Sequence, residues 1–464
     1  MQCLLKDWQS TSLRSIRKCL ALLVTVSFVS AAAASANPTT CEVSHSRTKD
    51  GKALCVRAAT ILLPQPRLTP TQIANGPDFD PAHPDRSRFA YFTDADTISC
   101  YFRPHYVFER LKSRSLKFQC WHMTPDGAFF GHRGERIAVE HPSVVITSDR
   151  NGNRSASLLD TDDSGETHEI KPDRLKIKYL SAPTPLQDPV YNEVFTEVAA
   201  TRILWLLGVP SDRVYPVGAA SCIGCGRDPF RNHLATNKAS LKDAPVVFNV
   251  VSASRRAPWE EIDTGGDATW DWRLTNRFYA DGEWTHQQKV EYDVYRLALG
   301  LIHFFNAAPK QNRLVCAAWQ PVTSPDAKVC ARPLIFVHDL GSTFGGEKGM
   351  NPWSANPRGH FTSWRQHPVF RHLQNCELSE PLGGDRRVLK DAQDLMIQRM
   401  AVLDPTTVSS IFRIARFQLM DREQLQRLRA AGSTNVERAA LDEWTTTFLE
   451  RVDEIRNAEH CRID

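Results

Sequence analysis

The chain has 464 residues, more than one ordinary domain, and its 42% hydrophobic and 24% charged residues are typical of a folded globular protein rather than a disordered one. Its formal net charge is only +4, and residues 1–36 supply +3 of it from four basic residues and one acidic residue. This balance excludes a nucleic-acid binder that works by bulk positive charge, and it argues against a polybasic or acidic partner.

Residues 1–36 are predicted to be a secretory signal peptide. After a basic stretch, an apolar core runs from Cys19 to Val29, and Ala34-Ser35-Ala36 provides an A-x-A cleavage site. A retained N-terminal anchor is the alternative, because Cys19 to Ala36 is 18 residues long, but the second half of this run is mostly alanine. Cleavage predicts an exported protein, periplasmic or extracellular, without a membrane span after the signal is removed.

Export places the cysteines in an oxidising compartment, where disulfides form. Ten of the 12 cysteines follow residue 36, which is an even number and allows five bridges. Their order suggests the pairs Cys41–Cys55, Cys100–Cys120, Cys222–Cys225, Cys316–Cys330 and Cys376–Cys461, although sequence does not fix connectivity. The pair Cys316–Cys330 has the best support, because both residues border apolar stretches that turn-like residues separate, as at the neck of a hairpin.

The motif Cys222-Ile-Gly-Cys225 has a second interpretation, as a redox or metal site. Such a site needs a thioredoxin-like context or a second pair of Cys or His ligands at metal spacing, and the neighbouring sequence offers neither. A structural disulfide is therefore favoured, and the redox or metal role stays as the alternative.

Along the chain, residues 37–95 are rich in Pro, Thr and Asp and are predicted to form an irregular N-terminal segment. Strands are expected at 116–120 and 137–146, and the polar residues 148–170 are expected to form a mobile loop. Basic and apolar residues then alternate over 174–179, with the two-residue period of a half-buried strand.

Helical periodicity dominates the remainder. Apolar residues predict one helix over 190–207, closed by Gly208, and another over 290–305. Later helices are expected at 395–403, 408–417 and 441–455. Strands first and mostly helices afterwards indicate an α+β fold, with a small sheet-rich lobe before a larger helical one.

Charged residues follow these elements in an order that phosphoryl-transfer enzymes use. Lys178 on the strand could reach nucleotide phosphates, and Glu197, nineteen residues later on the next helix, could pair with it. An apolar strand ending at Val337 leads into His338-Asp339-Leu340-Gly341, where Asp339 could present its oxygens to Mg²⁺. Each residue alone has an ordinary explanation. Lys178 could lie on a solvated strand face, Glu197 could be a surface glutamate with Glu193 as a competitor, and Asp339 could belong to a plain turn. Their order and spacing together favour a kinase-like site.

Several stretches resemble a family of uncharacterised exported bacterial proteins. These stretches are Lys176–Tyr179, Glu197–Gly208, Asp212–Val217, Cys222–Cys225, Gln311–Cys316, Phe336–Gly345 and Ile411–Arg416. That family is similar to a remote, atypical branch of the protein-kinase-like superfamily, nearer to the HipA-type and secreted kinases than to ordinary protein kinases. The resemblance covers about residues 116–418 and implies a bilobal kinase-like fold, here stapled by disulfides.

The resemblance also implies a domain organisation and cofactors. It implies a kinase-like N-lobe at 96–215, with an insertion near 127–170, and a helical C-lobe at 216–464. ATP with Mg²⁺ or Mn²⁺ is the implied cofactor. Lys178 and Glu197 would then lie at the nucleotide, and Asp339 and Gln311 at the metal.

The catalytic loop departs from the Asp-x-Lys-x-x-Asn pattern that the resemblance implies. Counted from Arg313, Asn306 stands at the position of the Asp, Ala308 at that of the Lys and Gln311 at that of the Asn. Asn306 cannot accept a proton from a substrate hydroxyl, because a neutral amide is barely basic. Since phosphoryl transfer relies mainly on positioning and electrostatics, these replacements predict weak, altered or absent catalysis.

Three functions therefore stay open. The chain could be a phosphoryl or nucleotidyl transferase, although ATP is scarce in the periplasm. It could be a pseudokinase that binds a protein or small-molecule partner without chemistry, or a disulfide-stapled scaffold that binds no nucleotide. Metal-dependent ATP binding separates the first two from the third, and group transfer separates the first from the second. No nucleic-acid partner is expected.

Overall fold

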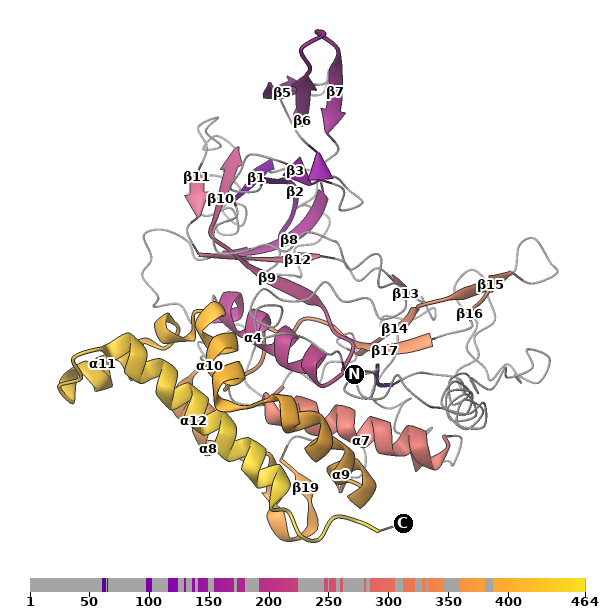
Figure 1. Cartoon of the computed structure of the whole chain (residues 1–464), viewed down its shortest axis with the longest axis vertical. Coiled ribbons are helices and arrows are strands. Elements are labelled where there is room, and N and C mark those ends of the chain that lie inside the picture. The colour runs from indigo at the N-terminus through magenta and orange to yellow at the C-terminus, as the bar shows by residue number, and fades with distance from the viewer. Residues whose placement is uncertain are drawn as a thin grey trace, which may run out of the picture. The chain divides into compact units, whose positions relative to one another are not determined.

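Figure 1 shows the computed structural model of the chain, whose described residues all lie within His45–Asp464. These residues are 61–63, 65, 97–101, 116–123, 129–130, 136–137, 141–148, 154–170, 173–179, 192–223, 246–248, 250–255, 259–261, 279–280, 284–304, 312–321, 328–330, 333–345, 359–379 and 387–463. The predicted signal peptide and the pair Cys41–Cys55 lie outside them.

The largest sheet has nine strands and follows the order β11-β10-β1-β2-β8-β12-β9, with β3 beside β2 and β4 beside β3. The strands are β1 (Thr97–Tyr101), β2 (Leu116–Met123), β3 (Phe129–Phe130), β4 (Arg136–Ile137), β8 (Asp173–Tyr179), β9 (Arg213–Val217), β10 (Ala219–Ile223), β11 (Val246–Phe248) and β12 (Val251–Arg255). All paired neighbours are antiparallel except β1 and β10. The predicted strands at 116–120 and 174–179 are both confirmed, and the sheet continues beyond residue 215 as far as Arg255.

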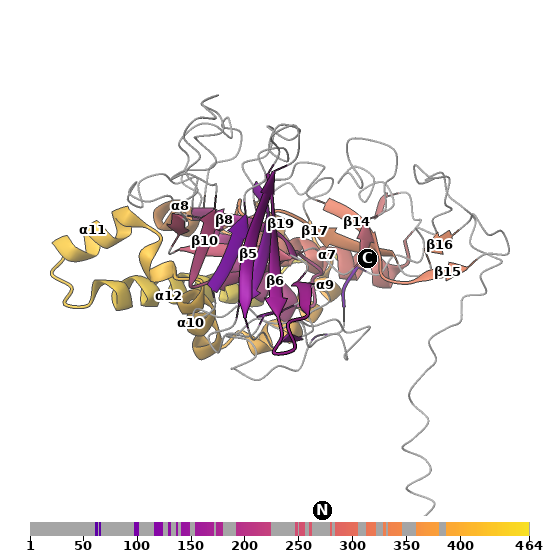
Figure 2. The same cartoon turned by 90° about the horizontal axis from the view of Figure 1, so that it is seen from above.

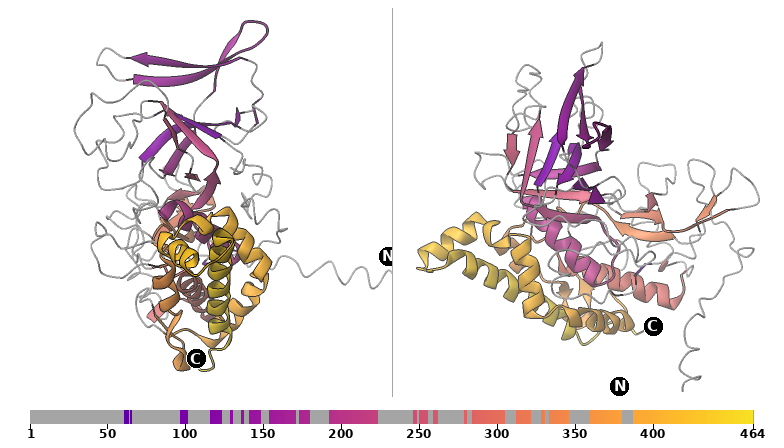
Figure 3. Two further views of the ribbon diagram at one scale, coloured as in Figure 1. Left: turned by 90° about the vertical axis from the view of Figure 1, so that its left-hand side faces the viewer. Right: turned by 45° about the horizontal axis from the view of Figure 1, so that its top comes forward.

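The prediction of a mobile loop at 148–170 is wrong for residues 154–170, which form two strands and a turn, and residues 149–153 lie outside the described residues. These strands belong to a separate antiparallel sheet, seen at the top of the left view of Figure 3. Its strands are β5 (Pro142–Ser148), β6 (Arg154–Thr161) and β7 (Thr167–Ile170). Three of the polar residues that suggested a loop, Asp162, Asp163 and Gly165, lie in the tight turn from β6 to β7. There Gly165 has φ +84°, and Asp162 accepts backbone hydrogen bonds from Ser164 and Glu166.

The predicted helices are present, together with two that were not expected, α8 and α11. They are α4 (Glu193–Leu206), α7 (His286–Leu301), α8 (Phe361–Gln366), α9 (Lys390–Arg399), α10 (Pro405–Ile414), α11 (Arg422–Ala430) and α12 (Val436–Arg456). Helix α11 escaped prediction because only Leu425 and Leu428 give it a buried apolar side. Gly208, with φ +78°, ends the α4 segment as predicted, in a conformation that glycine adopts without strain.

Helix α4 lies at the centre of this α+β arrangement. It packs against β8, β9 and β12 of the large sheet and against α10 (Figure 1). All its residues except Trp205 are buried, so α4 is a core helix whose polar residues are buried together with its apolar ones. Helices α9, α10 and α11 contact α12, and the orange and yellow helices form one group in both views of Figure 3. None of the described helices is long and apolar enough to cross a membrane.

A second, three-stranded sheet has the order β13-β14-β17. Its strands are β13 (Glu260–Glu261), β14 (Asn312–Cys316) and β17 (Pro333–Val337). Between β14 and β17 the chain forms a hairpin of β15 (Trp319–Pro321) and β16 (Lys328–Cys330), which lie side by side in Figure 2. The predicted hairpin is thus confirmed. Cys316 is disulfide-bonded, and its pairing with Cys330 stays a prediction.

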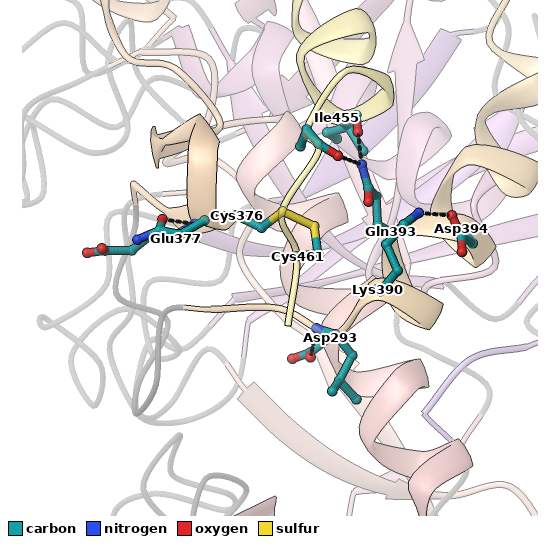
Figure 4. The surroundings of a disulfide bond; sticks show 11 residues. Asp293, Cys376, Glu377, Lys390, Gln393, Asp394, Ile455 and Cys461 are labelled. Carbon is teal, nitrogen blue, oxygen red and sulfur yellow. Dashed lines mark hydrogen bonds and ion pairs between the residues drawn. A yellow bond between two sulfur atoms is a disulfide. The ribbon is translucent and has the colours of Figure 1, made fainter. Parts of the chain in front are cut away.

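The predicted disulfide Cys376–Cys461 is confirmed (Figure 4). It joins the turn before β19 (Glu377–Leu378) to the C-terminal segment, which also pairs through Arg462 with Val388 and Lys390. In the large sheet Cys100 stands opposite Cys120 on one side and Cys222 on the other, so the backbone register allows the predicted pair Cys100–Cys120 without fixing it. Cys225 lies outside the described residues.

Candidate functional site

Lys178 extends from β8 toward helix α4. Its strand lies between β2 and β12, where Lys178 stands opposite Ser252 and the flanking Ile177 and Tyr179 are buried. Only 9% of the Lys178 side chain is exposed. An ammonium group so far from water requires compensating carboxylates.

Helix α4 supplies two such carboxylates. Glu193 and Glu197 are four residues apart, which places them on the same helix face. Lys178 Nζ donates a hydrogen bond to Glu197 Oε1 at 2.6 Å and a second to Glu193 Oε2. Glu197 is the most deeply buried of the three, with 2% of its side chain exposed. The predicted Lys178–Glu197 ion pair is therefore present, and Glu193 joins it.

Asp339 completes the cluster from a third segment, immediately after β17. Its Oδ1 accepts a hydrogen bond from Lys178 Nζ at 3.2 Å. Its backbone has φ +60°, in the left-handed region that Asp tolerates better than most residues. With 33% of its side chain exposed, Asp339 is the open end of an otherwise buried cluster. A ligand that reached the ammonium group would approach from this side.

Asp212 fixes the backbone on which Asp339 stands. Its Oδ2 accepts a hydrogen bond from the Asp339 amide at 2.8 Å, and its carboxylate lies 2.7 Å from His338 Nδ1. The neighbouring backbone is also paired, since Ser211 and Val337 form a parallel bridge. The segment that follows α4 thus holds the end of β17.

Gly341 brings the loop after Asp339 against helix α4. A Cβ atom at this position would lie 2.7 Å from Cγ and Cδ of Glu193, closer than real Cβ contacts. Thr196 Oγ1 donates a hydrogen bond to the Gly341 carbonyl oxygen at 3.0 Å. Glycine is therefore needed at position 341 because the loop approaches Glu193 of α4 closely, and not because its backbone has a positive φ.

The carboxylates of this cluster suit a hard divalent cation. Oxygen atoms of Glu193, Glu197 and Asp339 all lie within 4.8 Å of one another. Carboxylate oxygens are the ligands that Mg²⁺ and Mn²⁺ prefer. The donor set therefore fits the cation that the kinase resemblance implies, with Asp339 as the accessible ligand.

A second acidic group, Asp162, Glu166 and His168, lies at the exposed turn between β6 and β7. Here Asp162 Oδ1 accepts hydrogen bonds from the Ser164 hydroxyl at 2.6 Å and from the backbone of Ser164 and Glu166. The Ser164 hydroxyl is the main cause that lowers the Asp162 pKa, and the Glu166 backbone adds to it. These bonds close the turn, so this group has a structural explanation.

The structure brings Lys178, Glu197 and Asp339 together, as their order along the chain suggested. Asn306 and Gln311, the proposed catalytic-loop positions, lie outside the described residues. Sequence reasoning treated Glu193 only as a competitor of Glu197, although the four-residue spacing could have shown that both share a face. It gave Asp212 no role, because nothing local marks a carboxylate that acts on a residue 127 positions away.

Comparison with known proteins adds a structural likeness. No protein-family model matches the chain, and no curated protein matches its sequence significantly. Among solved structures it is similar to a Helicobacter pylori proinflammatory kinase, CtkA, at 13% identity and a TM-score of 0.33. The alignment covers 68% of this chain and 94% of the kinase. A likeness of this size does not define the fold, so the functional argument rests on the site itself.

Proposed function

We propose that this chain is an exported kinase-like protein with a bilobal fold, which binds a nucleotide with a divalent cation at the cluster around Lys178. The observation that carries the proposal is the position of Lys178 Nζ between Glu197 Oε1 and Asp339 Oδ1, at 2.6 and 3.2 Å. A lysine on a strand, a glutamate on the following helix and an aspartate after a later strand are the parts with which kinases orient phosphates and metal.

Each residue has a role that follows from its contacts. Lys178 supplies the positive charge for the phosphates, and Glu197 orients it by the most deeply buried of its ion pairs. Asp339, which is partly exposed, would hold Mg²⁺ or Mn²⁺. A bound cation would neutralise phosphate charge, which is the chemistry it contributes in such sites. Gln311 would assist with its amide oxygen.

A thermal-shift measurement tests this proposal. Oxidised mature protein is heated with ATP, with and without Mg²⁺ or Mn²⁺, beside the variants Asp339→Ala and Lys178→Met. Ligand at about 100 times its Kd stabilises the folded state by about 2.7 kcal/mol, which raises the midpoint visibly. A metal-dependent shift in the wild type that both variants lose supports a nucleotide site.

The second candidate is a pseudokinase, which the Asn306 and Ala308 positions favour. Phosphate or AMP transfer from labelled ATP separates the two, because only the transferase labels a substrate or itself. If no nucleotide shifts the midpoint, the ion pairs of Lys178 are structural and the chain is a disulfide-stapled scaffold for a protein or small-molecule partner. Export is tested separately by mass spectrometry, which should find a mature N-terminus at Asn37.

A further inference from the structure

We infer that Asp212 is a positioning residue for this site: it fixes the left-handed backbone of Asp339 and so aims the Asp339 carboxylate at Lys178. The effect of Asp212 on ligand binding rests on the proposed function, whereas its effect on the backbone of Asp339 does not. Asp212 binds the backbone amide of Asp339, so the role inferred for it is to act through Asp339.

The first argument is the hydrogen bond to the Asp339 amide. Asp212 Oδ2 accepts it at 2.8 Å from a residue whose φ is +60°. A left-handed backbone is strained for most residues other than glycine and persists only where its surroundings fix it. A carboxylate is a strong acceptor for a backbone amide, because the bond is assisted by charge. Asp212 thus stabilises the conformation that directs Asp339 inward.

The second argument is burial. Only 8% of the Asp212 side chain is exposed, and a carboxylate so placed needs donors for its oxygens. His338 Nδ1, at 2.7 Å, is one donor and the Asp339 amide is the other. Both belong to the two residues that follow β17. The carboxylate of Asp212 is therefore directed at the loop that carries Asp339.

The third argument is the connection to helix α4. The Asp212 amide donates to the Val337 carbonyl oxygen at 3.1 Å, and the Asp212 carbonyl oxygen accepts from Thr201 Oγ1 at 3.1 Å. Asp212 is therefore bonded at one end to α4, which carries Glu193 and Glu197, and at the other to the strand that carries Asp339. This arrangement sets the distance between the carboxylates of α4 and Asp339 before any ligand binds.

Two substitutions separate geometry from charge. Asp212→Asn keeps the length of the side chain and an oxygen for the Asp339 amide, and its NH₂ group can donate to His338 in the other tautomer. Asp212→Glu keeps the charge but moves the carboxylate by one methylene. If positioning matters, the amide variant retains function and the glutamate variant loses it.

The test measures Mn²⁺ affinity by electron paramagnetic resonance, in the presence of ATP, on the full mature chain. Residues that orient metal ligands typically change affinity by about 10- to 100-fold when mutated. We expect Asp212→Glu and Asp212→Ala to raise the Kd by about tenfold or more, and Asp212→Asn by about threefold or less. The control is Asp293→Asn. Asp293 is a still more deeply buried carboxylate on α7 that also accepts from a backbone amide, and its substitution should leave the Kd unchanged.

Hydrogen exchange provides a readout that needs no ligand. Peptides covering residues 337–345 should exchange faster in Asp212→Glu and Asp212→Ala than in wild type or Asp212→Asn, while peptides from α12 stay unchanged. If wild type binds no Mn²⁺, the proposed function fails, and exchange alone decides the positioning role. Equal exchange and equal affinity in the asparagine and glutamate variants would overturn the inference, even if Asp212→Ala does not fold.

Discussion

Among the described helices, α4 and α7 both bury carboxylates, and the two clusters differ in whether a carboxylate remains accessible to solvent. On α7, Asp293 is fully buried and accepts from Arg296 at 2.9 Å, from Tyr279 Oη at 2.9 Å and from the Leu389 amide at 2.9 Å. On α4, Glu193 and Glu197 are also buried, but their cluster reaches the partly exposed Asp339. Burial alone therefore does not distinguish the proposed site, which differs from the α7 cluster in having a partly exposed carboxylate.

The α7 cluster around Asp293 anchors this helix to neighbouring segments of the fold. Tyr279 also accepts a hydrogen bond from Arg462, so the cluster ties α7 to the start of α9 and to the C-terminal segment. Burial raises the pKa of Asp293 in spite of the opposing charge of Arg296, and burial raises that of Tyr279 as well. Arg296, Tyr279 and the Leu389 amide all donate to Asp293 from within the fold, so this cluster is a structural anchor.

Breaking the disulfide next to this anchor should have the largest effect on stability. In the double variant Cys376→Ser/Cys461→Ser, a bridge across a sequence separation of 85 residues is lost. Loop-closure entropy predicts that the free energy of unfolding falls by about 4 kcal/mol. Urea unfolding of oxidised wild type and variant measures the difference. A loss smaller than about 1 kcal/mol would show that the C-terminal segment is held mainly by its backbone pairing and side chains.

Removing the anchor carboxylate should come next. Asp293→Ala takes away an acceptor used by Arg296, Tyr279 and the Leu389 amide, which should lower the free energy of unfolding by about 3 kcal/mol. Asp293→Asn should cost less, because the amide oxygen still accepts from Leu389. The midpoint shift caused by ATP and metal should be the same in both variants as in wild type. A changed ligand response would contradict the separation of anchor and site.

The sequence predicted the helices and strands of both regions better than it predicted the contacts between them. Alternation over 174–179 and helical spacing over 190–207 gave β8 and α4, because local backbone preference and burial repeat along one element. The meeting of Lys178 with Asp339, 161 positions apart, followed only from the order of the parts in kinases. Asp212 could not be found in this way, since its role depends on tertiary proximity to a single amide.

The contacts of two regions could not be read from their composition. The polar residues of 148–170 suggested a loop, but the described residues among them form two strands and the turn between them, which holds Asp162, Asp163 and Gly165. Helix α4 was predicted from its apolar residues, but its polar residues are buried as well, because strands cover one face and α10 another. In both cases composition described the local chain correctly and gave no information on what packs against it.

A glycine-to-alanine substitution tests the close contact between the loop after Asp339 and helix α4. Gly341→Ala would push a Cβ into Glu193 and should destabilise the fold by about 2 kcal/mol. The added change Glu193→Ala should restore most of this loss, because it removes the clashing atoms. Gly300→Ala on α7 is the control, since its Cβ would meet Val369 at an ordinary 3.4 Å. A double-mutant cycle from urea unfolding gives the coupling, and additive losses would contradict direct contact.

The smallest effect is expected at the exposed turn around Asp162. This turn also tests whether exposed carboxylates are sufficient for a binding site. The pKa of Asp162 is lowered by hydrogen bonds, so the turn is stabilised at pH values above the ordinary aspartate range, and this contribution is lost as pH falls through the lowered pKa. Amide shifts of Ser164 and Glu166, followed by NMR, should therefore move together only in acid. Asp162→Ala should abolish that transition without changing the response to ATP and metal. A loss of that response would mean that this open acidic group, and not only the cluster around Lys178, takes part in binding.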